Sequence, residues 1–206
     1  MTQETHKKQT VGILAYGSLI SNPGEEIEKA RTEIIKNVMT PFPVEYARSS
    51  SGRGGAPTLV PVSSGGAKVR GQVFAMDFSE EEAANILYRR EIGKVGEFAK
   101  TYKRPEEVKN STVLVERLTN FAGLDVVLYT KIAATIQPLS AAHLVRLAIK
   151  SVSRAKPGLD GITYLRAAKE SGIETALSPA YEAGILEETE SVSLNEAYRK
   201  VVTDNS

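Results

Sequence analysis

Two separated segments carry residue types that could do chemistry in this chain. The first is residues 13–24, where an apolar run ends in Tyr16, Gly17, Ser18 and Leu19. Gly17 permits a positive φ and close approach of a ligand to the backbone, Ser18 adds a small hydroxyl, and successive amides in such a turn can form an anion-binding nest. An ordinary exit from a strand into a loop gives the same pattern. The functional interpretation is a strand end that presents backbone N–H groups to an anion.

The second segment is residues 78–93, which contain Glu91. Ser79 followed by Glu82 matches a capping box and Gly93 is a typical stop, so the segment predicts a helix with defined ends. Helical spacing then places Glu91 close to the apolar face of that helix. A carboxylate in this position is the candidate general acid and base of the chain.

The environment of this carboxylate sets two opposing tendencies. Burial and the negative end of the helix dipole both disfavour its ionised form, whereas Arg89 and Arg90 favour that form if they fold back onto it. A carboxylate balanced in this way suits proton transfer near neutral pH. The alternative is that Glu91 only forms an ion pair with an arginine at the helix end.

The composition of the chain excludes several classes of function. Its 206 residues suit one domain, which we expect over residues 11–206 after a disordered tail at residues 1–10. The net charge of +1 gives no case for a nucleic-acid partner. No apolar run approaches the length of a membrane span, so we expect no membrane association and a cytoplasmic location.

Nucleophile and metal chemistry are also restricted by the residue types present. The chain has no cysteine, which excludes disulfides, a thiolate metal site and a cysteine nucleophile. Its two histidines are His6, in the expected tail, and His143, on an expected amphipathic helix. We therefore discount a histidine-ligated metal site and a histidine-based triad, and we expect no metal and no cofactor, with a carboxylate-only magnesium site as the alternative.

The order of the expected elements alternates strands with helices. Residues 11–16 predict a strand, and Asn22 with Pro23 predicts the start of a helix that continues to Val38. Further strands are expected at residues 44–50, 58–62, 69–78, 112–118 and 126–132. Further helices are expected at residues 141–155 and 162–171 and near Tyr181 and Asn195. The strands between residues 44 and 78 are predicted to form an antiparallel meander.

The glycine-rich residues 51–55 do not match a phosphate-binding loop. They lack both the dinucleotide glycine spacing and the lysine of a P-loop, so a mobile hairpin turn is the better interpretation. Arg53 in this turn is a candidate to bind a substrate carboxylate, with a merely solvated arginine as the alternative.

Together these segments resemble the γ-glutamylcyclotransferase-like superfamily, and most closely its ChaC-type branch. The branch has a YGSLxxNPG-like start, an RGTP-like turn and a YxxRE-like helix end, which correspond to residues 16–24, 53–57 and 88–91 here. The resemblance covers about residues 13–129. It implies an α+β fold, a small mixed β-barrel flanked by helices, in which the YGSL loop binds the glutamyl group and one glutamate handles the proton.

Carried onto this chain, the resemblance implies a γ-glutamylcyclotransferase that releases 5-oxoproline from a γ-glutamyl peptide such as glutathione. Glu91 is then the catalytic residue, and the turn at residues 16–19 binds the substrate with help from Arg53. Tyr129 occupies the place where related enzymes have a strand tyrosine that touches the substrate, and a barrel-wall aromatic is the alternative. Two other functions stay open: a cyclotransferase for a γ-glutamylamine or biosynthetic intermediate, and a non-catalytic binder of a small ligand.

Overall fold

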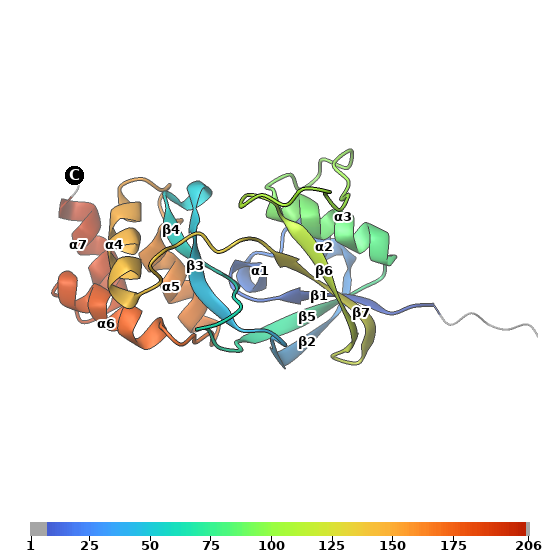
Figure 1. Cartoon of the computed structure of the whole chain (residues 1–206), viewed down its shortest axis with the longest axis horizontal. Coiled ribbons are helices and arrows are strands. Elements are labelled where there is room, and N and C mark those ends of the chain that lie inside the picture. Colours follow the sequence, from blue (N-terminus) through green and yellow to red (C-terminus); the bar gives the residue numbers. More distant parts are fainter. Residues whose placement is uncertain (1–7, 205–206) are drawn as a thin grey trace, which may run out of the picture.

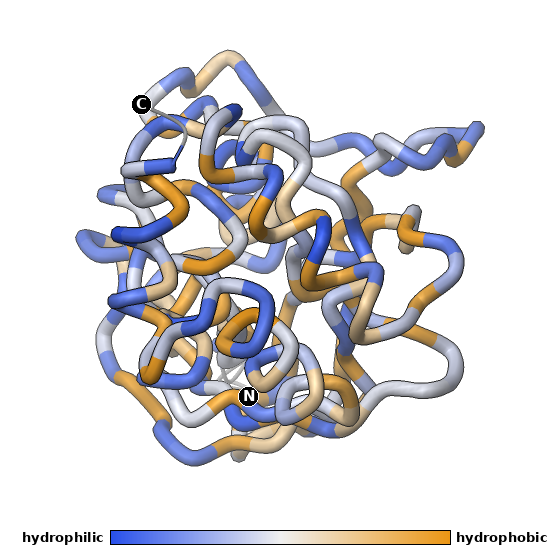
Figure 2. The backbone as a smooth tube through the Cα atoms, turned by 90° about the vertical axis from the view of Figure 1, so that its left-hand side faces the viewer, coloured by the Kyte–Doolittle hydropathy of each residue, from blue (hydrophilic) through white to orange (hydrophobic). Residues whose placement is uncertain are grey.

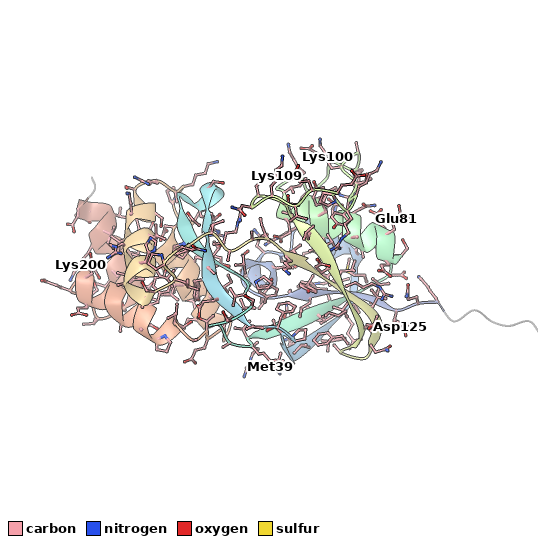
Figure 3. The ribbon with its side chains drawn as sticks, viewed as in Figure 1. Met39, Glu81, Lys100, Lys109, Asp125 and Lys200 are labelled. Carbon is pink, nitrogen blue, oxygen red and sulfur yellow. The ribbon has the colours of Figure 1, made fainter. Side chains whose placement is uncertain are left out.

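The computed structural model describes residues 8–204 of the chain, and most of the expected tail, residues 1–7, lies outside the described residues. Thr10 is held at the start of the fold, because its backbone N and its Oγ1 both donate to Oδ2 of Asp125 at 2.8 Å. Figure 3 shows Asp125 beside the point where the chain enters the sheet. The described residues include no helix that is long and apolar enough to cross a membrane.

Seven strands and seven α-helices make up residues 8–204 (Figure 1). The strands are β1 (Val11–Ala15), β2 (Arg31–Met39), β3 (Val44–Ser50), β4 (Ala56–Pro61), β5 (Arg70–Met76), β6 (Leu114–Phe121) and β7 (Leu124–Lys131). The helices are α1 (Ser18–Ser21), α2 (Glu25–Ala30), α3 (Glu80–Glu91), α4 (Ala141–Val152), α5 (Gly161–Glu170), α6 (Ser178–Glu188) and α7 (Leu194–Asp204). A 3₁₀ turn, η1 (Ser51–Arg53), joins β3 to β4.

Five strands form one mixed sheet in the order β2-β5-β1-β7-β6. The central strand β1 runs antiparallel to β5 and parallel to β7, with Val11 opposite Val126 and Ile13 opposite Leu128. Because parallel strands end at the same edge of a sheet, Tyr16 and Thr130 are brought together just beyond this pair. Helix α3 covers one face, where its Leu87 packs among the buried side chains of β1 and β7.

The α+β class predicted from the sequence is therefore confirmed. The strand pairings among residues 8–204 leave β2 and β6 as the edges of the larger sheet, and no closed barrel is found there.

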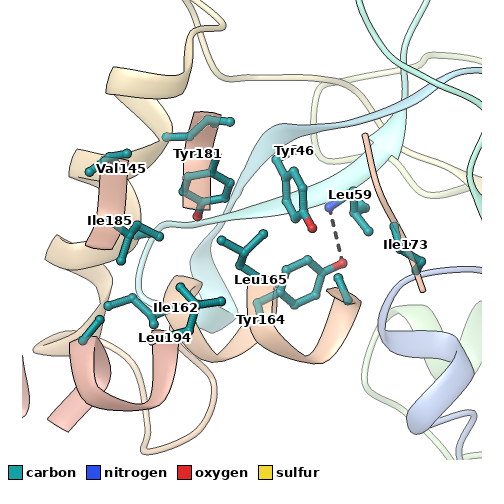
Figure 4. Close-up of a cluster of buried hydrophobic side chains, with 14 of the residues drawn as sticks. Tyr46, Leu59, Val145, Ile162, Tyr164, Leu165, Ile173, Tyr181, Ile185 and Leu194 are labelled. Atoms are coloured by element: carbon teal, nitrogen blue, oxygen red, sulfur yellow. Dashed lines mark hydrogen bonds between the residues drawn. The ribbon is translucent and has the colours of Figure 1, made fainter. Parts of the chain in front are cut away.

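The helices α4–α7 and the two-stranded sheet β3–β4 form a second layer of the molecule, which we call the helical lobe (Figure 1). Along the chain at this end of the molecule, hydrophobic and hydrophilic segments alternate, as amphipathic helices require (Figure 2). Figure 4 shows the cluster of buried side chains at its centre, which includes Tyr46 of β3, Tyr164 of α5 and Tyr181 of α6. The helical lobe thus has its own apolar core beside that of the larger sheet.

Two of the predicted elements are wrong. The helix expected to reach Val38 ends at Ala30, and Ile34 and Val38 lie in strand β2. Ile34 and Val38 are β-branched and therefore suit a strand. The pairing of β2 with β5 outweighs the helical spacing of these residues, and the register of this pairing has two irregularities. Met39 at the end of β2 is half exposed (Figure 3).

The expected three-stranded meander is also wrong. Strands β3 and β4 pair only with each other among the named strands, whereas β5 pairs with β1 and β2 in the larger sheet. Turn signals gave the strand ends correctly but carry no information on which strands become neighbours.

Helix α3 has the predicted ends. The Oγ of Ser79 accepts a hydrogen bond from the backbone N of Glu82 at 3.2 Å, and Gly93 takes a φ of +69° just past the last turn. The carboxylate of Glu82 accepts instead from Asn85 and Arg89, so half of the expected capping box forms. The helix that carries Glu91 therefore begins and stops where the sequence indicates.

Within the helical lobe, a buried carboxylate joins β3 to the helices. Glu45 is fully buried, and its Oε1 accepts hydrogen bonds from Thr175 Oγ1 at 2.5 Å and from the backbone N of Tyr46 at 2.9 Å. Its Oε2 accepts from the backbone N of Leu177 at 3.0 Å. Three donors satisfy this carboxylate and tie β3 to the segment that connects α5 with α6.

We predict that Glu45→Gln lowers the free energy of unfolding by about 1–3 kcal/mol, because the NH₂ group of the new amide replaces an oxygen to which one or two N–H or O–H groups now donate. Glu33→Gln, on an exposed position of β2, is the matched control and should change stability by less than about 0.5 kcal/mol. Urea unfolding of both variants measures this. Equal stability of the two variants would show that Glu45 does not anchor the lobe.

Candidate active site

The predicted turn, Glu91 and a tyrosine of α5 meet at a small cavity, the Glu91 cavity, of about 60 Å³. It lies where the ends of β1 and β7 approach α1, the last turn of α3, and the helical lobe. Its lining residues are Leu14, Tyr16, Ser18, Leu19, Leu59, Val60, Arg90, Glu91, Thr130, Ile132 and Tyr164. The structure thus brings together residues that are more than a hundred positions apart in the sequence.

Glu91 projects from the last turn of α3 and is partly buried. Its Oε1 accepts a hydrogen bond from Arg90 Nη1 at 2.6 Å, and the two side chains form an ion pair. No hydrogen bond among the described residues engages Oε2. One carboxylate oxygen is therefore held by the neighbouring guanidinium, and the other is open to a proton from a ligand.

Arg90 connects this carboxylate to the turn. Its Nη2 donates to the backbone O of Asn22 at 2.7 Å and to Ser18 Oγ at 3.3 Å, and its Nε donates to the same carbonyl at 3.2 Å. Arg89 faces the other way, where it is buried and paired with Glu26 and Glu82. Of the two arginines expected to compete for Glu91, Arg90 alone contacts it in the described chain.

The backbone at Gly17 requires glycine. Its φ of +61° and ψ of −137° lie outside the regions that side chains allow, and a Cβ there would lie 2.9 Å from Tyr164 Oη. No backbone hydrogen bond among the described residues engages the amide nitrogens of Gly17, Ser18 or Leu19. These N–H groups, at the start of the short helix α1, are free to bind an anion.

The two tyrosines of the Glu91 cavity differ in whether the hydroxyl proton is already used in a hydrogen bond. Tyr16 Oη donates to the backbone O of Thr130 at 3.1 Å, so its proton is already engaged. Tyr164 Oη accepts from the backbone N of Leu59 at 3.3 Å (Figure 4). Burial raises the pKa of Tyr16 well above its usual value, with the Glu91 carboxylate as a second cause, and burial also raises the pKa of Tyr164. Both hydroxyls are therefore neutral at physiological pH.

Arg53 lies in an adjoining cavity of about 140 Å³, the Arg53 cavity, which shares Ser18 and Tyr164 with the Glu91 cavity. Its guanidinium carbon lies 4.7 Å from the centre of the Tyr164 ring, and its Nη1 donates to the backbone O of Leu159 at 3.4 Å. No ion pair among the described residues includes Arg53. Burial lowers its pKa, and the nearby Asp160 carboxylate acts in the opposite direction without forming an ion pair with Arg53.

Tyr129 is not brought to Glu91. Side chains alternate along β7, so Thr130 lines the Glu91 cavity while Tyr129 lines a different cavity of about 510 Å³. There its ring packs against Phe42, with ring centres 4.5 Å apart. Tyr129 therefore packs as a structural aromatic residue of the sheet, and it is not one of the residues that line the Glu91 cavity.

Sequence reasoning missed the contribution of the helical lobe. No motif of the sequence gives Tyr164 a role, and the sequence indicates Arg90 only as a neighbour of Glu91. Asp160, which caps α5 through the backbone N of Thr163, is the signal that fixes where that helix starts. No local pattern indicates that the helix delivers a hydroxyl to the turn at Gly17.

Neither kind of comparison with known proteins finds a relative. No protein-family model matches the sequence, and no curated protein matches it significantly. Within residues 8–204, histidine, aspartate and glutamate side chains form no cluster of three that could hold a metal ion. The function must therefore be argued from the geometry of the site.

We predict that Gly17→Ala lowers the free energy of unfolding by about 2–4 kcal/mol, through backbone strain and overlap with Tyr164. Gly93→Ala is the control, because Gly93 also has a positive φ but a Cβ there meets nothing within 4 Å. That variant should lose only about 1 kcal/mol. Urea unfolding of both variants measures the difference, and equal losses would show that neither the unusual ψ of Gly17 nor its contact with Tyr164 constrains the turn.

Proposed function

We propose that this protein is a γ-glutamylcyclotransferase that releases 5-oxoproline from a γ-glutamyl peptide by intramolecular cyclisation. The observation that carries the proposal is a carboxylate with one free oxygen, on Glu91, in the same cavity as an amide-rich turn at residues 16–19. The resemblance of both segments to the ChaC-type branch supports the same assignment. The finer fold assignment, to the γ-glutamylcyclotransferase-like kind, belongs to this proposal, whereas the expected closed barrel is not found among the described residues.

The substrate of such an enzyme carries its own nucleophile. Its α-nitrogen attacks the γ-carbonyl carbon, the carbonyl electrons move to oxygen, and a five-membered ring closes. The intermediate then collapses, which breaks the bond between the γ-carbon and the departing nitrogen. Two protons leave the α-ammonium group and both end on the released amine, so the products are 5-oxoproline and an alkylammonium ion.

In this proposal each group of the site has one task. Glu91 Oε2 takes the protons from the α-nitrogen one at a time and passes them to the departing nitrogen. The amides of Gly17, Ser18 and Leu19 bind the α-carboxylate, and Tyr16 shapes the floor of the site. The turn and the carboxylate are held in register by Arg90, so the substrate is bound near its ring-closing conformation.

Measurement of 5-oxoproline release tests the proposal. The purified protein should cleave γ-glutamyl dipeptides or glutathione and leave matched α-glutamyl dipeptides intact, because only the γ-linkage places amine and carbonyl for a five-membered ring. Glu91→Gln should reduce turnover by about 10²- to 10⁴-fold, the usual contribution of a positioned acid and base, without loss of fold. Glu97→Gln, in the exposed loop after α3, is the control and should leave turnover unchanged.

Three results would count against the proposal. Turnover of Glu91→Gln within a few-fold of the parent would remove the general base. Release of 5-oxoproline from an α-linked peptide would contradict the cyclisation geometry. Release from none of the substrates would favour the alternative of a small-ligand binder.

Arg53 discriminates between a γ-glutamyl peptide and a γ-glutamylamine. Its partly buried guanidinium, which forms no ion pair within the described residues, fits the C-terminal carboxylate of a departing amino acid or peptide. We predict that γ-glutamyl-glycine is cleaved with at least a tenfold higher kcat/KM than γ-glutamyl-methylamine, and that Arg53→Gln removes this preference. Initial rates with the two substrates measure it. An equal loss on both substrates would instead assign Arg53 to the glutamyl moiety.

A further inference from the structure

The proposed reaction also needs a group that stabilises the oxyanion formed during ring closure. As the α-nitrogen attacks, negative charge develops on the γ-carbonyl oxygen, and an enzyme lowers the barrier by aiming a hydrogen-bond donor at that oxygen. We propose that the hydroxyl of Tyr164, from the helical lobe, is this donor. The inference rests on the proposed function and adds a second catalytic residue to it.

The hydrogen bonds of the two cavity tyrosines distinguish their roles. The proton of Tyr16 is engaged by the carbonyl of Thr130, which leaves that hydroxyl able to accept but not to donate. Tyr164 has the opposite arrangement. Its oxygen accepts a hydrogen bond from the backbone N of Leu59, and no described residue accepts its proton. Of these two hydroxyls, Tyr164 is therefore the one with a proton to offer a ligand.

The position of Tyr164 suits this task. It lines both the Glu91 cavity and the Arg53 cavity, so it stands between the proposed base and the proposed carboxylate site. Its oxygen lies 2.9 Å from where a Cβ of Gly17 would be, against the backbone that is proposed to hold the α-carboxylate. A γ-carbonyl bound between the turn and Glu91 comes within reach of this hydroxyl.

The charges around Tyr164 act in both directions. Arg53 and Arg90 lower its pKa and so favour donation, whereas the Glu91 carboxylate raises it. Burial keeps the hydroxyl protonated at neutral pH by raising its pKa. The Arg53 guanidinium, 4.7 Å from the ring centre, favours the negative charge that the phenol oxygen gains as it donates to an oxyanion. The donor is thus neutral in the resting site and stabilised when charge develops.

Packing of the helical lobe fixes the direction of this hydroxyl. Gly161 at the start of α5 lies so close to α4 that a Cβ there would meet the Cα of Ala148 at 2.7 Å. Ile162 and Leu165, on either side of Tyr164, are buried in the core of the lobe. A side chain on a packed helix is held more rigidly than one on a loop, as a preorganised donor requires.

Kinetics of Tyr164→Phe test the inference. The variant keeps the ring that packs against Arg53 and loses only the hydroxyl, so kcat for 5-oxoproline release should fall about 10²-fold while KM changes less than threefold. Tyr181→Phe is the matched control, because Tyr181 is a fully buried tyrosine of the same core that lines neither of the two cavities. Its kcat should stay within twofold of the parent, and melting curves verify that both variants are folded.

A second variant supplies a signature that a structural role would not produce. Replacement of Tyr164 by 3,5-difluorotyrosine keeps the shape of the side chain but makes the phenol more acidic. A phenolate cannot donate to an oxyanion, so kcat of this variant should fall at a lower pH than kcat of the parent. This measurement stands even if Tyr164→Phe is poorly folded.

The outcomes separate the inference from the proposed function. An active parent with unchanged kcat in Tyr164→Phe, or with the same pH profile in the fluorinated protein, overturns the role of Tyr164 and leaves the cyclotransferase intact. A rise in KM alone overturns the oxyanion role and assigns Tyr164 to substrate binding. A parent that releases no 5-oxoproline from any γ-glutamyl substrate overturns both.

Discussion

The guanidinium of Arg90 is the contact on which the candidate site depends. It donates at the same time to Glu91, to Ser18 and to the carbonyl of Asn22, and so it joins the last turn of α3 to both ends of α1. Arg90 makes the hydrogen bonds that join this end of α3 to residues 18–22 in the described part of the chain. A planar group with several donors in a fixed fork also fixes direction.

This arrangement explains why Glu91 can be both held and available. A carboxylate with an ion pair on both oxygens would be an inert structural group. Here Oε1 is occupied by Arg90, and Oε2 makes no hydrogen bond among the described residues. The alternative that Glu91 only forms an ion pair therefore applies to its Oε1 atom. The proposed proton transfer uses its Oε2 atom.

The site is shared between the two layers of the molecule. The larger sheet supplies Tyr16 and the turn that follows it, whereas the helical lobe supplies Tyr164 and the surroundings of Arg53. The buried carboxylate of Glu45 is one of the links that hold β3 against the segment between α5 and α6 within this lobe. Stability of the lobe and geometry of the site are thus coupled, since a shift of α5 would move the Tyr164 hydroxyl.

The sequence by itself determined the local features of this protein. It indicated a strand at residues 11–16, which the structure has at residues 11–15, together with the ends of α3 and the special glycine at position 17. These features depend on neighbouring residues, as backbone conformation and capping do. It also identified the turn and Glu91 as one candidate site, through paired motifs. It did not foresee that β2 would be a strand, since its Ile34 and Val38 fit both periods.

Only the tertiary structure decided which distant groups meet. The parallel pairing of β1 with β7 put Thr130 beside Tyr16 and turned Tyr129 to the other face, because alternation along a strand fixes faces only after register is set. The packing of α5 against α4 brought Tyr164 to Gly17 across almost 150 positions of sequence. Such long-range contacts arise from the summed burial of many side chains, and no short segment of sequence encodes them.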